Sequence, residues 1–398
     1  MTAGHRAAFV WALLGLSACV HPGVVPSGTR TSQIGRTTQI SQSGRGAYEV
    51  SLAVGASRIA AAWYDTRDGN PEIYLRLLDP EGRPAGAEHR LTDDLLLSYE
   101  ADIDLIGGEV VVAWYDRAPD GRLRAQVGRW TVDGTRRWVR PLSAHTGDAR
   151  NPQVVVDGDR MFCVWIEADQ AGQVAVWARW LDGAGEPVTS PERLAPAGDT
   201  TWNLNATLDD DGEAWVVFDA AVDTRADELF LVRTTPGHRE VARLTADDGF
   251  ASKYPDLALA GDRAALTWFD ERDGNQEIYL FAAPSAGLEA GVEAALHRVT
   301  DTPGDSFGAY VAWNERRVGV AWSDAQDSQS EVYFQSFDPD GRPLESPRRL
   351  TNNTTASLIP AVEPWGDGFV LAWNEDVVAE RGNHEAGGRS EIVFIYVE

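Results

Sequence analysis

The chain has 398 residues, of which 43% are hydrophobic, and it contains 15 Trp, 38 Gly and 20 Pro. This composition supplies a large apolar core and many tight turns, which excludes a disordered chain and favours short strands. The formal net charge of −26 repels phosphate backbones and anionic headgroups, so we expect no nucleic-acid partner.

The first eighteen residues have the pattern of an export signal. His5 and Arg6 precede an apolar run, 7–16, that is too short to cross a bilayer as a helix. The four residues LSAC at 16–19 then resemble the lipobox of bacterial lipoproteins. We therefore expect residues 1–18 to be a lipoprotein signal peptide.

The lipobox resemblance implies a membrane anchor at Cys19. In that family the signal peptidase cuts before the cysteine, and the acyl chains that it then carries hold the protein at a membrane permanently. Val20 is not the Asp that retains lipoproteins in the inner membrane, so the resemblance implies an outer-membrane protein of the cell envelope, facing the periplasm or the surface. Residues 19–35 are expected to be the lipidated end and a flexible tether. Cys163 is then the only thiol, which excludes a disulfide within a monomer.

One pattern recurs in seven copies after the tether. In each copy an apolar run ends at an anchor residue, a carboxylate follows two positions later, and successive anchors are 51 to 54 residues apart. A period of about 50 residues is typical of β-propellers, in which each repeat is one blade. In the fourth copy we expect Trp215, two residues before the anchor, to fill the space of a Trp anchor. The anchors are Trp63, Trp114, Trp165, Val217, Trp268, Trp322 and Trp373, and the carboxylates are Asp65, Asp116, Glu167, Asp219, Asp270, Asp324 and Glu375.

The first repeat shows how one copy forms a sheet. Its second strand is an apolar run without alternation, which is expected where a sheet is buried on both faces. Turn-forming residues such as Asp79-Pro80-Glu81-Gly82 separate the strands. Four antiparallel strands are predicted for each blade, and in this one they are a at 48–54, b at 58–64, c at 72–78 and d at 89–92.

The two ends of the chain complement each other. Residues 391–398 form a c strand that no d strand follows, whereas residues 36–41 precede the first repeat in the place of a d strand. We predict that residues 36–41 supply the outer strand of the last blade and so remove an exposed edge. The sequence thus predicts an all-β, seven-bladed β-propeller over residues 36–398, and we expect it to be a monomer.

Two segments carry a family resemblance. The segment 65–74 (DTRDGNPEIY) with Arg90-Leu91-Thr92 after it, and the segment 270–279 (DERDGNQEIY) with Arg298-Val299-Thr300 after it, resemble the WD40-like repeat of the TolB family. Partial copies begin at Glu228 and Glu331. The resemblance implies an exported bacterial propeller that works by binding protein partners or ligands.

A second resemblance concerns the Trp-x-Asp-x-Arg pattern, as at Trp63, Asp65 and Arg67, which is similar to sialidase-like propellers. The Asp-box of that family is not found. A sialidase-like mechanism requires three arginines around one carboxylate, but only Arg150 is well placed for the channel. The other candidates fall in a–b turns on the opposite face, and they are Arg58, Arg160, Arg263 and Arg317.

The carboxylates after strand b are the first candidate site. An Asp at a strand end can accept N–H groups of the b–c turn and pair with an Arg two residues later, as Asp65 with Arg67 and Asp270 with Arg272. Recurrence in every repeat favours this structural role, because a catalytic group is needed once. The alternative is Ca²⁺ in the two richest loops, and no other cofactor is expected. Its ligands would come from Asp65, Asp68, Asn70 and Glu72, and from Asp270, Asp273, Asn275 and Glu277.

The second candidate is the residue fifteen positions before each anchor, at the mouth of strand a. Stacking aromatic rings together with one Arg and one Lys would suit a sugar or a peptide at a ligand-binding rim. The competing interpretation is that these large side chains are wedges between neighbouring blades. The rim residues are Tyr48, Tyr99, Arg150, Trp202, Lys253, Phe307 and Leu358.

The leading functional hypothesis is a non-enzymatic, lipid-anchored propeller of the bacterial envelope, bound to the membrane through Cys19. It would recognise a protein or glycan partner with the face that bears the d–a and b–c loops, and no catalytic residue is assigned. The alternatives are a sialidase-like carbohydrate-active hydrolase and an envelope scaffold without a small ligand.

Overall fold

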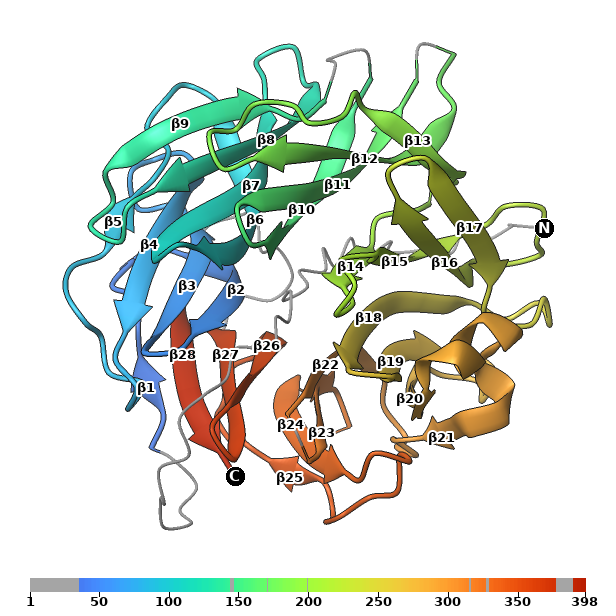
Figure 1. Cartoon of the computed structure of the whole chain (residues 1–398). Helices are drawn as coiled ribbons and strands as arrows, with labels where there is room; N and C mark the ends of the chain where they lie inside the picture. Colours follow the sequence, from blue (N-terminus) through green and yellow to red (C-terminus); the bar gives the residue numbers. More distant parts are fainter. Residues whose placement is uncertain are drawn as a thin grey trace, which may run out of the picture.

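The computed structural model describes residues 36–143, 147–169, 171–198, 200–314, 316–326, 329–376 and 389–398. These residues form seven four-stranded antiparallel sheets arranged around a central axis (Figure 1). Each sheet is one blade, so the predicted seven-bladed propeller is confirmed. The predicted signal peptide and tether, with Cys19, lie outside the described residues.

In every blade the strands follow one another outward from the axis. The innermost strands, a, are β2 (Ala47–Gly55), β6 (Leu97–Ile106), β10 (Ala149–Asp157), β14 (Leu204–Leu208), β18 (Ser252–Ala260), β22 (Ser306–Trp313) and β26 (Ser357–Trp365). The b strands are β3 (Arg58–Asp65), β7 (Glu109–Arg117), β11 (Arg160–Ala168), β15 (Ala214–Ala220), β19 (Arg263–Asp270), β23 (Val318–Asp324) and β27 (Gly368–Asp376). The c strands are β4 (Glu72–Leu78), β8 (Leu123–Trp130), β12 (Val174–Asp182), β16 (Glu228–Thr235), β20 (Glu277–Pro284), β24 (Glu331–Phe337) and β28 (Ser390–Val397). The outer strands, d, are β5 (His89–Arg90), β9 (Arg136–Pro141), β13 (Glu192–Pro196), β17 (His238–Arg243), β21 (Leu296–Arg298), β25 (Arg348–Arg349) and β1 (Thr38–Gln39).

Helical structure is confined, in the described part of the chain, to two short 3₁₀ helices between β20 and β21. They are η1 (Ser285–Ala290) and η2 (Val292–Ala295), and they bury Leu288 and Val292 against the outer part of the fifth blade. None of the helices in these residues is long and apolar enough to span a bilayer.

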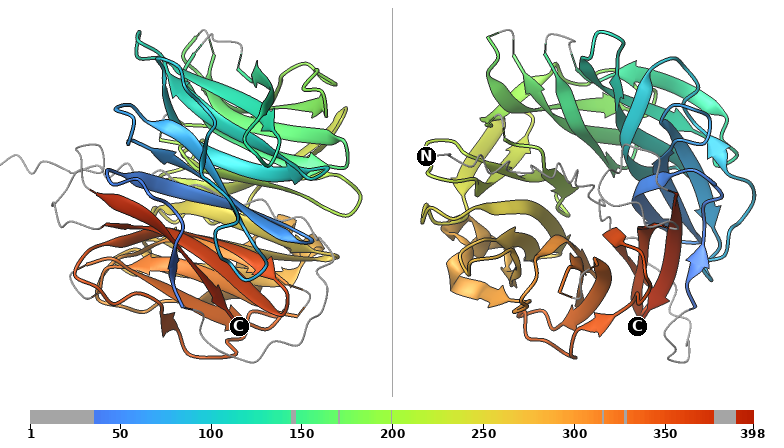
Figure 2. Two further views of the ribbon diagram at one scale, coloured as in Figure 1. Left: turned by 90° about the vertical axis from the view of Figure 1, so that its left-hand side faces the viewer. Right: turned by 180° about the vertical axis from the view of Figure 1, so that it is seen from behind.

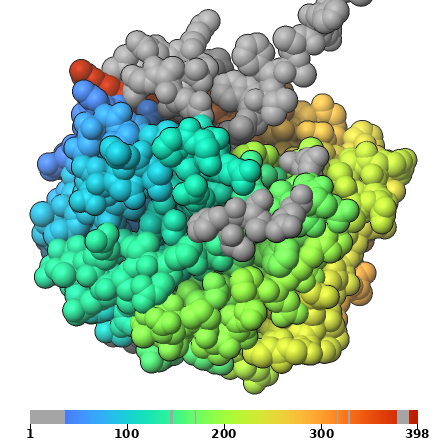
Figure 3. All heavy atoms as spheres, turned by 90° about the horizontal axis from the view of Figure 1, so that it is seen from above, coloured from blue at the N-terminus to red at the C-terminus, as the bar shows by residue number. Residues whose placement is uncertain are grey.

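The core lies between the blades. The buried hydrophobic side chains of the described residues group into seven clusters, and each cluster joins two adjacent blades. The cluster between the last and first blades, for example, packs Trp63 against Trp365 and Phe394. Since both faces of each b strand are covered in this way, its side chains are apolar without alternation. Neighbouring blades are in direct contact, and they follow one another in chain order when the ring is seen from its edge (Figure 3).

The chain ends close the ring as predicted. Strand β1 pairs antiparallel with β28, with Thr38 opposite Phe394 and Gln39 opposite Val393. The N–H of Ile40 donates to the carbonyl of Ile392 at 2.8 Å. Figure 2 shows the N-terminal strand in blue beside the C-terminal strands in red from both directions. The last blade thus takes its outer strand from the start of the described chain.

In the fourth blade, the residues of strand b that face each neighbouring blade differ from the prediction. Val217 and Trp215 pack on the fifth blade, whereas the six Trp anchors pack on the preceding blade. Phe218 packs on the third blade and lies opposite Phe230, as Trp63 lies opposite Tyr74. The assignment of the anchor to Val217 is therefore wrong by one residue, and the expectation that Trp215 fills the space of a Trp anchor is also wrong, because Trp215 packs on the opposite neighbour. A b strand is buried on both faces, so its apolar run does not reveal which side chains face which blade.

Candidate functional site

The predicted ring of carboxylates forms hydrogen bonds at the ends of the b strands. The indole Nε1 of an anchor Trp donates to the carboxylate two residues later, at 3.2 Å in the pair Trp63 and Asp65 and at 2.7 Å in the pair Trp165 and Glu167. Arg67 donates to Asp65 through both its backbone N–H and its guanidinium, as predicted. Further pairs of this kind are Trp114 with Asp116, Trp268 with Asp270, Trp373 with Glu375, and Arg272 with Asp270.

Two carboxylates of the ring do not hold an indole. Asp324 accepts the Ser306 hydroxyl at 2.9 Å and the N–H of Gln326 at 2.9 Å, and Asp219 differs because of the shifted register of its blade. Its Oδ2 accepts the backbone N–H of Tyr254 at 3.0 Å and the side-chain amide of Asn203 at 3.1 Å. It therefore links the fourth blade to the fifth instead of holding an indole. Burial raises the pKa of Asp219 to about 6.

Protein donors occupy the carboxylates of the two loops considered for calcium. Asp68 accepts a hydrogen bond from the Tyr74 hydroxyl, and its other contact is Arg90 at 3.5 Å. In the second loop, Asp273 accepts from the Tyr279 hydroxyl and lies 3.4 Å from Arg298. Within the described ranges, no three or more His, Cys, Asp or Glu side chains are grouped so that they could hold a metal ion.

The residues that carry the TolB resemblance form a clip between strands c and d. Glu72, which is fully buried, accepts from Thr92 Oγ1 at 2.5 Å and from Arg90 at 2.7 Å. Thr92 Oγ1 in turn accepts the N–H of Ile73 at 2.8 Å. The motif therefore has a structural explanation in the blade itself. The same Thr-to-Glu contact recurs between Thr245 and Glu228, Thr300 and Glu277, and Thr351 and Glu331.

The rim residues divide into two groups. Tyr48, Arg150 and Leu358 are buried between blades, as the wedge interpretation expects. The guanidinium of Arg150 donates to the carbonyl of Thr201 at 2.6 Å and lies 4.3 Å from the centroid of the Trp202 ring, so it joins the third blade to the fourth. The half-buried members, which keep exposed surface at the mouth of the channel, are Tyr99, Trp202, Lys253 and Phe307.

The residue after each rim position adopts a left-handed backbone in six blades, which the sequence reasoning missed. Each of these residues lies where the pairing of strand a with strand b shifts its register. Left-handed backbone costs a non-glycine residue about 1–2 kcal/mol, and such strain is concentrated at functional sites. A signal was available at three of the positions, where Glu49, Glu100 and Asn151 place a polar residue inside an innermost strand. The six residues and their φ angles are Glu49 (53°), Glu100 (50°), Asn151 (46°), Tyr254 (58°), Gly308 (59°) and Ile359 (54°).

Glu49 and Glu100, from adjacent blades, form what we call the axial pair. Glu49 is 6% exposed and Glu100 is 0% exposed, and the buried Oε2 of each has no hydrogen-bond partner. Burial raises the pKa of Glu100 to about 8, against the opposing effects of Tyr115, which donates to its Oε1 at 3.3 Å, and of two arginine charges. Burial and the nearby charge of Glu100 hold the pKa of Glu49 well above its usual range.

Four tyrosines adjoin the axial pair in a row across the first two blades. The ring centroids of Tyr48 and Tyr64 are 5.3 Å apart, those of Tyr64 and Tyr99 are 5.3 Å apart, and those of Tyr99 and Tyr115 are 5.7 Å apart. Burial raises the pKa of Tyr64 well above its usual range, and the carboxylates of Glu49 and Glu100 add to this effect. Tyr48 and Tyr99 are both rim residues, and of these two Tyr99 is the one that is only half-buried. The pair and the row thus bring buried acidic and aromatic groups together near the start of strands β2 and β6.

Polar side chains of the a strands also connect the blades along the axis. Asp102 accepts the N–H of Val154 in the next blade at 2.8 Å, and Asp256 accepts that of Val311 at 2.7 Å. These bonds satisfy backbone groups on the inner edge of each sheet, which would otherwise be unpaired. Glu363 is 0% exposed and neither of its oxygens has a hydrogen-bond partner, so burial, with Asp104, Asp256 and Asp102 nearby, holds its pKa well above the usual range.

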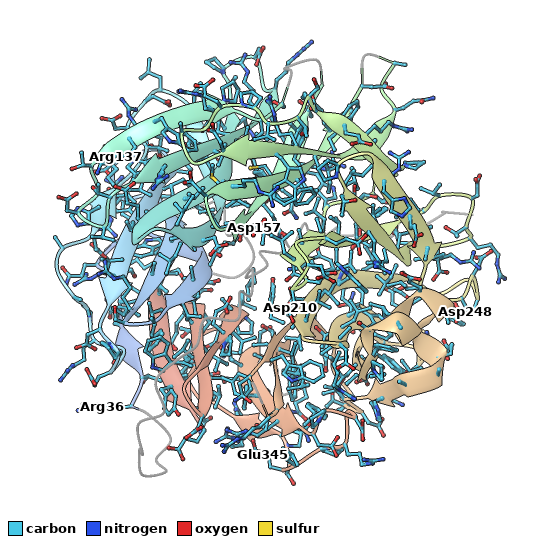
Figure 4. All side chains as sticks on the ribbon, viewed as in Figure 1. Arg36, Arg137, Asp157, Asp210, Asp248 and Glu345 are labelled. Atoms are coloured by element: carbon cyan, nitrogen blue, oxygen red, sulfur yellow. The ribbon has the colours of Figure 1, made fainter. Side chains whose placement is uncertain are left out.

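The arginines of the a–b turns do not approach the rim. Arg160 pairs with Asp157, which ends strand β10 at the opposite end from Arg150. Figure 4 labels Asp157 and Asp210, both at a–b turns, next to the central axis. Arg263 binds Asp340 at 2.7 Å. The three-arginine arrangement that a sialidase-like mechanism requires is therefore not assembled by these side chains.

No protein-family model matches the sequence, and no curated protein matches it. Solved structures share its fold at low identity. A puromycin-hydrolysing peptidase of Mycobacterium tuberculosis matches 89% of this chain with a TM-score of 0.55 at 12% identity, but this chain spans only 52% of the peptidase. An endosialidase of phage phi92 matches 92% of this chain, and 69% of its own, with a TM-score of 0.52 at 10% identity. A polysaccharide lyase named ulvan lyase matches 76% of this chain, and 80% of its own, with a TM-score of 0.50 at 10% identity. These similarities show that the chain has the β-propeller fold. At such low identity they show the fold alone, so the function is inferred from the chemistry of the site.

Proposed function

We propose that this chain is a lipid-anchored binding module of the bacterial envelope, which recognises a glycan with the face that carries the rim. The observation that carries the proposal is that four rim residues keep part of their side-chain surface exposed at the same end of the innermost strands, namely Tyr99, Trp202, Lys253 and Phe307. Their side chains differ in chemistry although they occupy matching places in a repeating frame. A repeat needs no such variety for stability, whereas a binding surface does.

The chemistry of the rim suits a saccharide. The aromatic rings of the rim offer flat apolar faces to sugar rings. The polar ends of Tyr99 and Trp202 and the ammonium of Lys253 offer directional contacts to sugar hydroxyl groups. Two solved propellers with comparable folds carry names that refer to saccharides, an endosialidase and a lyase bound to a GlcA–Rha3S unit. A protein partner is the other class that the same surface would suit, and it is an outcome of the test below.

The binding test uses alanine variants of the half-buried aromatic residues of the rim. Trp202→Ala and Tyr99→Ala should each reduce retention of envelope polysaccharide by the purified protein at least tenfold, while the melting temperature falls by only a few degrees. Val241→Ala, at a 50% exposed position on outer strand β17, is the control and should bind normally. Arg150 is unsuitable because it is buried between two blades. Capture of a protein, with no polysaccharide retained, would contradict the glycan assignment.

The anchor has its own test. The lipobox resemblance at residues 16–19 supports cleavage before Cys19 and acylation of its sulfur. Mass spectrometry of the mature N-terminus should find acyl chains on Cys19, and Cys19→Ser should move the protein from the outer-membrane fraction to the soluble fraction. An unmodified Cys19 in a membrane-bound protein would contradict this part of the proposal.

A carbohydrate-active hydrolase is the second candidate. The observation that favours it is the axial pair, in which Glu100, with a pKa of about 8, accepts a hydrogen bond from Tyr115. Carboxyl groups with raised pKa values serve as general acids in glycosidases. Turnover of aryl glycosides that is lost in Glu100→Gln would establish hydrolysis, and the absence of turnover across a broad panel would eliminate it.

A further inference from the structure

The Thr-to-Glu clip occurs in four blades of the described chain, and its copy in the fourth blade is incomplete. Thr245 Oγ1 donates to Glu228 Oε2 at 2.6 Å and accepts the N–H of Leu229 at 2.9 Å, as Thr92 does in the first blade. Glu228 is 0% exposed, and its second oxygen, Oε1, is buried without a hydrogen-bond partner among the described residues. The fourth clip therefore holds a carboxyl group of which one oxygen has no donor.

The other three clips supply donors to this second oxygen. Oε1 of Glu72 accepts the side-chain amide of Asn70 at 2.7 Å and the guanidinium of Arg90 at 2.7 Å. The equivalent donors are Asn275 and Arg298 for Glu277, and Arg349 for Glu331. Such bonds favour the ionised form of a carboxyl group, so a complete clip stabilises a carboxylate.

The sequence of the fourth blade accounts for one missing donor, and its structure for the other. Ala226 occupies the place of Asn70, two residues before the glutamate, and its side chain has no donor. Arg243 occupies the place of Arg90 in the pairing of strands c and d, but it makes no hydrogen bond to Glu228 Oε1. The fourth clip thus keeps its threonine and lacks both donors to the second oxygen.

The charges around Glu228 do not replace these donors. Burial raises the pKa of Glu228 to about 7, with a contribution from the carboxylates of Asp248 and Asp247 between β17 and β18. The hydrogen bond from Thr245 and the charge of Arg243, at the end of β17, oppose this shift only in part. The cations of the adjoining segments have other partners, and these pairs are Lys253 with Asp227 at 3.2 Å and Arg225 with Asp247 at 3.3 Å.

We propose that Glu228 is a proton-dependent switch that sets how readily the outer strand of the fourth blade opens. With its proton the carboxyl group is neutral, and an unpaired oxygen costs less than it would on a carboxylate. After the proton is lost, a buried charge lacks a donor, so the bonds that hold the end of β17 to β16 break more often. The complete clips respond differently, because their Asn and Arg donors stabilise the charged form.

The switch adjoins the rim. The carbonyl of Asp227, next to Glu228, accepts the N–H of Ser252 at 2.8 Å, and the Asp227 carboxylate binds the rim residue Lys253. Residues 244–251 connect the clip to the strand that bears this lysine. Opening of the clip therefore loosens the segment that positions Lys253, whatever ligand the rim binds.

The direction of the pH effect follows from the open and closed states of the clip. In the open state the carboxyl group has the ordinary glutamate pKa of 4.5, and in the closed state its pKa is about 7. Between these values the open state releases the proton while the closed state keeps it, so opening becomes easier as the pH rises. Above the closed-state pKa both states are ionised, and the effect is constant.

Two amides report on the clip. The N–H of Leu229 donates to Thr245 Oγ1, and the N–H of Leu244 donates to the carbonyl of Leu229 at 2.8 Å. Their hydrogen exchange in the full chain is measured by mass spectrometry and divided by that of the Glu228→Gln variant at the same pH, which removes the pH dependence of the chemical step. This ratio should rise at least tenfold between pH 5 and pH 7 and level off at higher pH.

Two comparisons locate the effect at the unpaired oxygen. Ala226→Asn restores a donor that the first and fifth clips possess, and it should reduce the rise to less than threefold. The amides of Ile278 and Val299, which are equivalent in the fifth blade, should show no rise. Exchange in the natural protein divided by that in Ala226→Asn gives a second measurement, independent of Glu228→Gln. A constant ratio for the natural protein, an undiminished rise in Ala226→Asn, or an equal rise in the fifth blade would each overturn the proposal.

Discussion

Ser41 and Glu391, 350 residues apart, form the same clip that Thr92 and Glu72 form within the first blade. The Ser41 hydroxyl donates to the Glu391 carboxylate and accepts the N–H of Ile392 at 2.7 Å. Thr92 makes the equivalent two bonds with Glu72 and the N–H of Ile73. The last blade therefore contains the same hydrogen bonds as the first blade, but the two residues that form them come from opposite ends of the chain.

Removing the Glu391 carboxylate should weaken this closure strongly. It also accepts the N–H groups of Ser43 at 3.0 Å and Gly44 at 2.9 Å, so Glu391→Ala leaves several donors without an acceptor. We expect the free energy of unfolding in urea to fall by about 3 kcal/mol. Glu81→Ala, at an exposed turn, should change it by less than about 0.5 kcal/mol. Equal stability of the two variants would show that the clip does not hold the ring closed.

Thr92→Val tests the clip inside a blade. Valine has nearly the shape of threonine but no hydroxyl, so the buried Glu72 loses a donor and the N–H of Ile73 loses an acceptor. The expected loss in the free energy of unfolding is about 2–4 kcal/mol. Thr131→Val, whose hydroxyl lies in an exposed turn, is the matched control. A loss no larger than that of the control would contradict the structural role of the motif.

Stability should depend on pH through Glu363. Its pKa in the folded state is raised well above 4.5 by burial, with additional effects of Asp104, Asp256 and Asp102. Below the unfolded-state pKa both states hold the proton, so stability is unaffected there. As pH rises above that value the unfolded state releases the proton while the folded state keeps it, and stability falls by up to about 1.4 kcal/mol per pH unit until the folded-state pKa is reached.

Glu363→Gln removes this proton exchange without removing the side chain. The melting temperature of the variant relative to the natural protein should therefore increase between pH 5 and pH 7, as calorimetry can measure. Glu81→Gln should show no such trend. A constant difference across this range would mean that Glu363 does not carry a raised pKa in the folded protein.

The thiol of Cys163 should be inert in the folded protein. It is fully buried in the cluster between the second and third blades, and burial raises its pKa far above that of a free thiol. Only a thiolate reacts with iodoacetamide, so labelling should require denaturation in guanidinium chloride. Ser57→Cys, in an exposed turn, should react at once and serves as the positive control. Rapid labelling of Cys163 under native conditions would show that this blade interface opens.

The repeat itself determined the number of blades, the four-strand pattern and the closure by residues 36–41. The blade number and the strand pattern depend on signals that lie close together in the chain, namely apolar runs, turn residues and the spacing between them, and these recur in every repeat. The closure followed from the same pattern, because the last repeat lacks a d strand and residues 36–41 have the pattern of one. The roles of Asp65 and Asp270 were predicted for the same reason, since their partners Arg67 and Arg272 are two residues away.

Contacts between blades were decided by the tertiary structure alone. The face on which Val217 packs depends on which neighbouring blade covers it, and the burial of Arg150 depends on a carbonyl in the next blade. The pairing of Glu49 with Glu100 required both the left-handed backbone at these residues and the radial packing of two sheets. One blade's sequence specifies its own hydrogen bonds, but the side chains that meet between blades are about 50 residues apart and are brought together only by the closed ring.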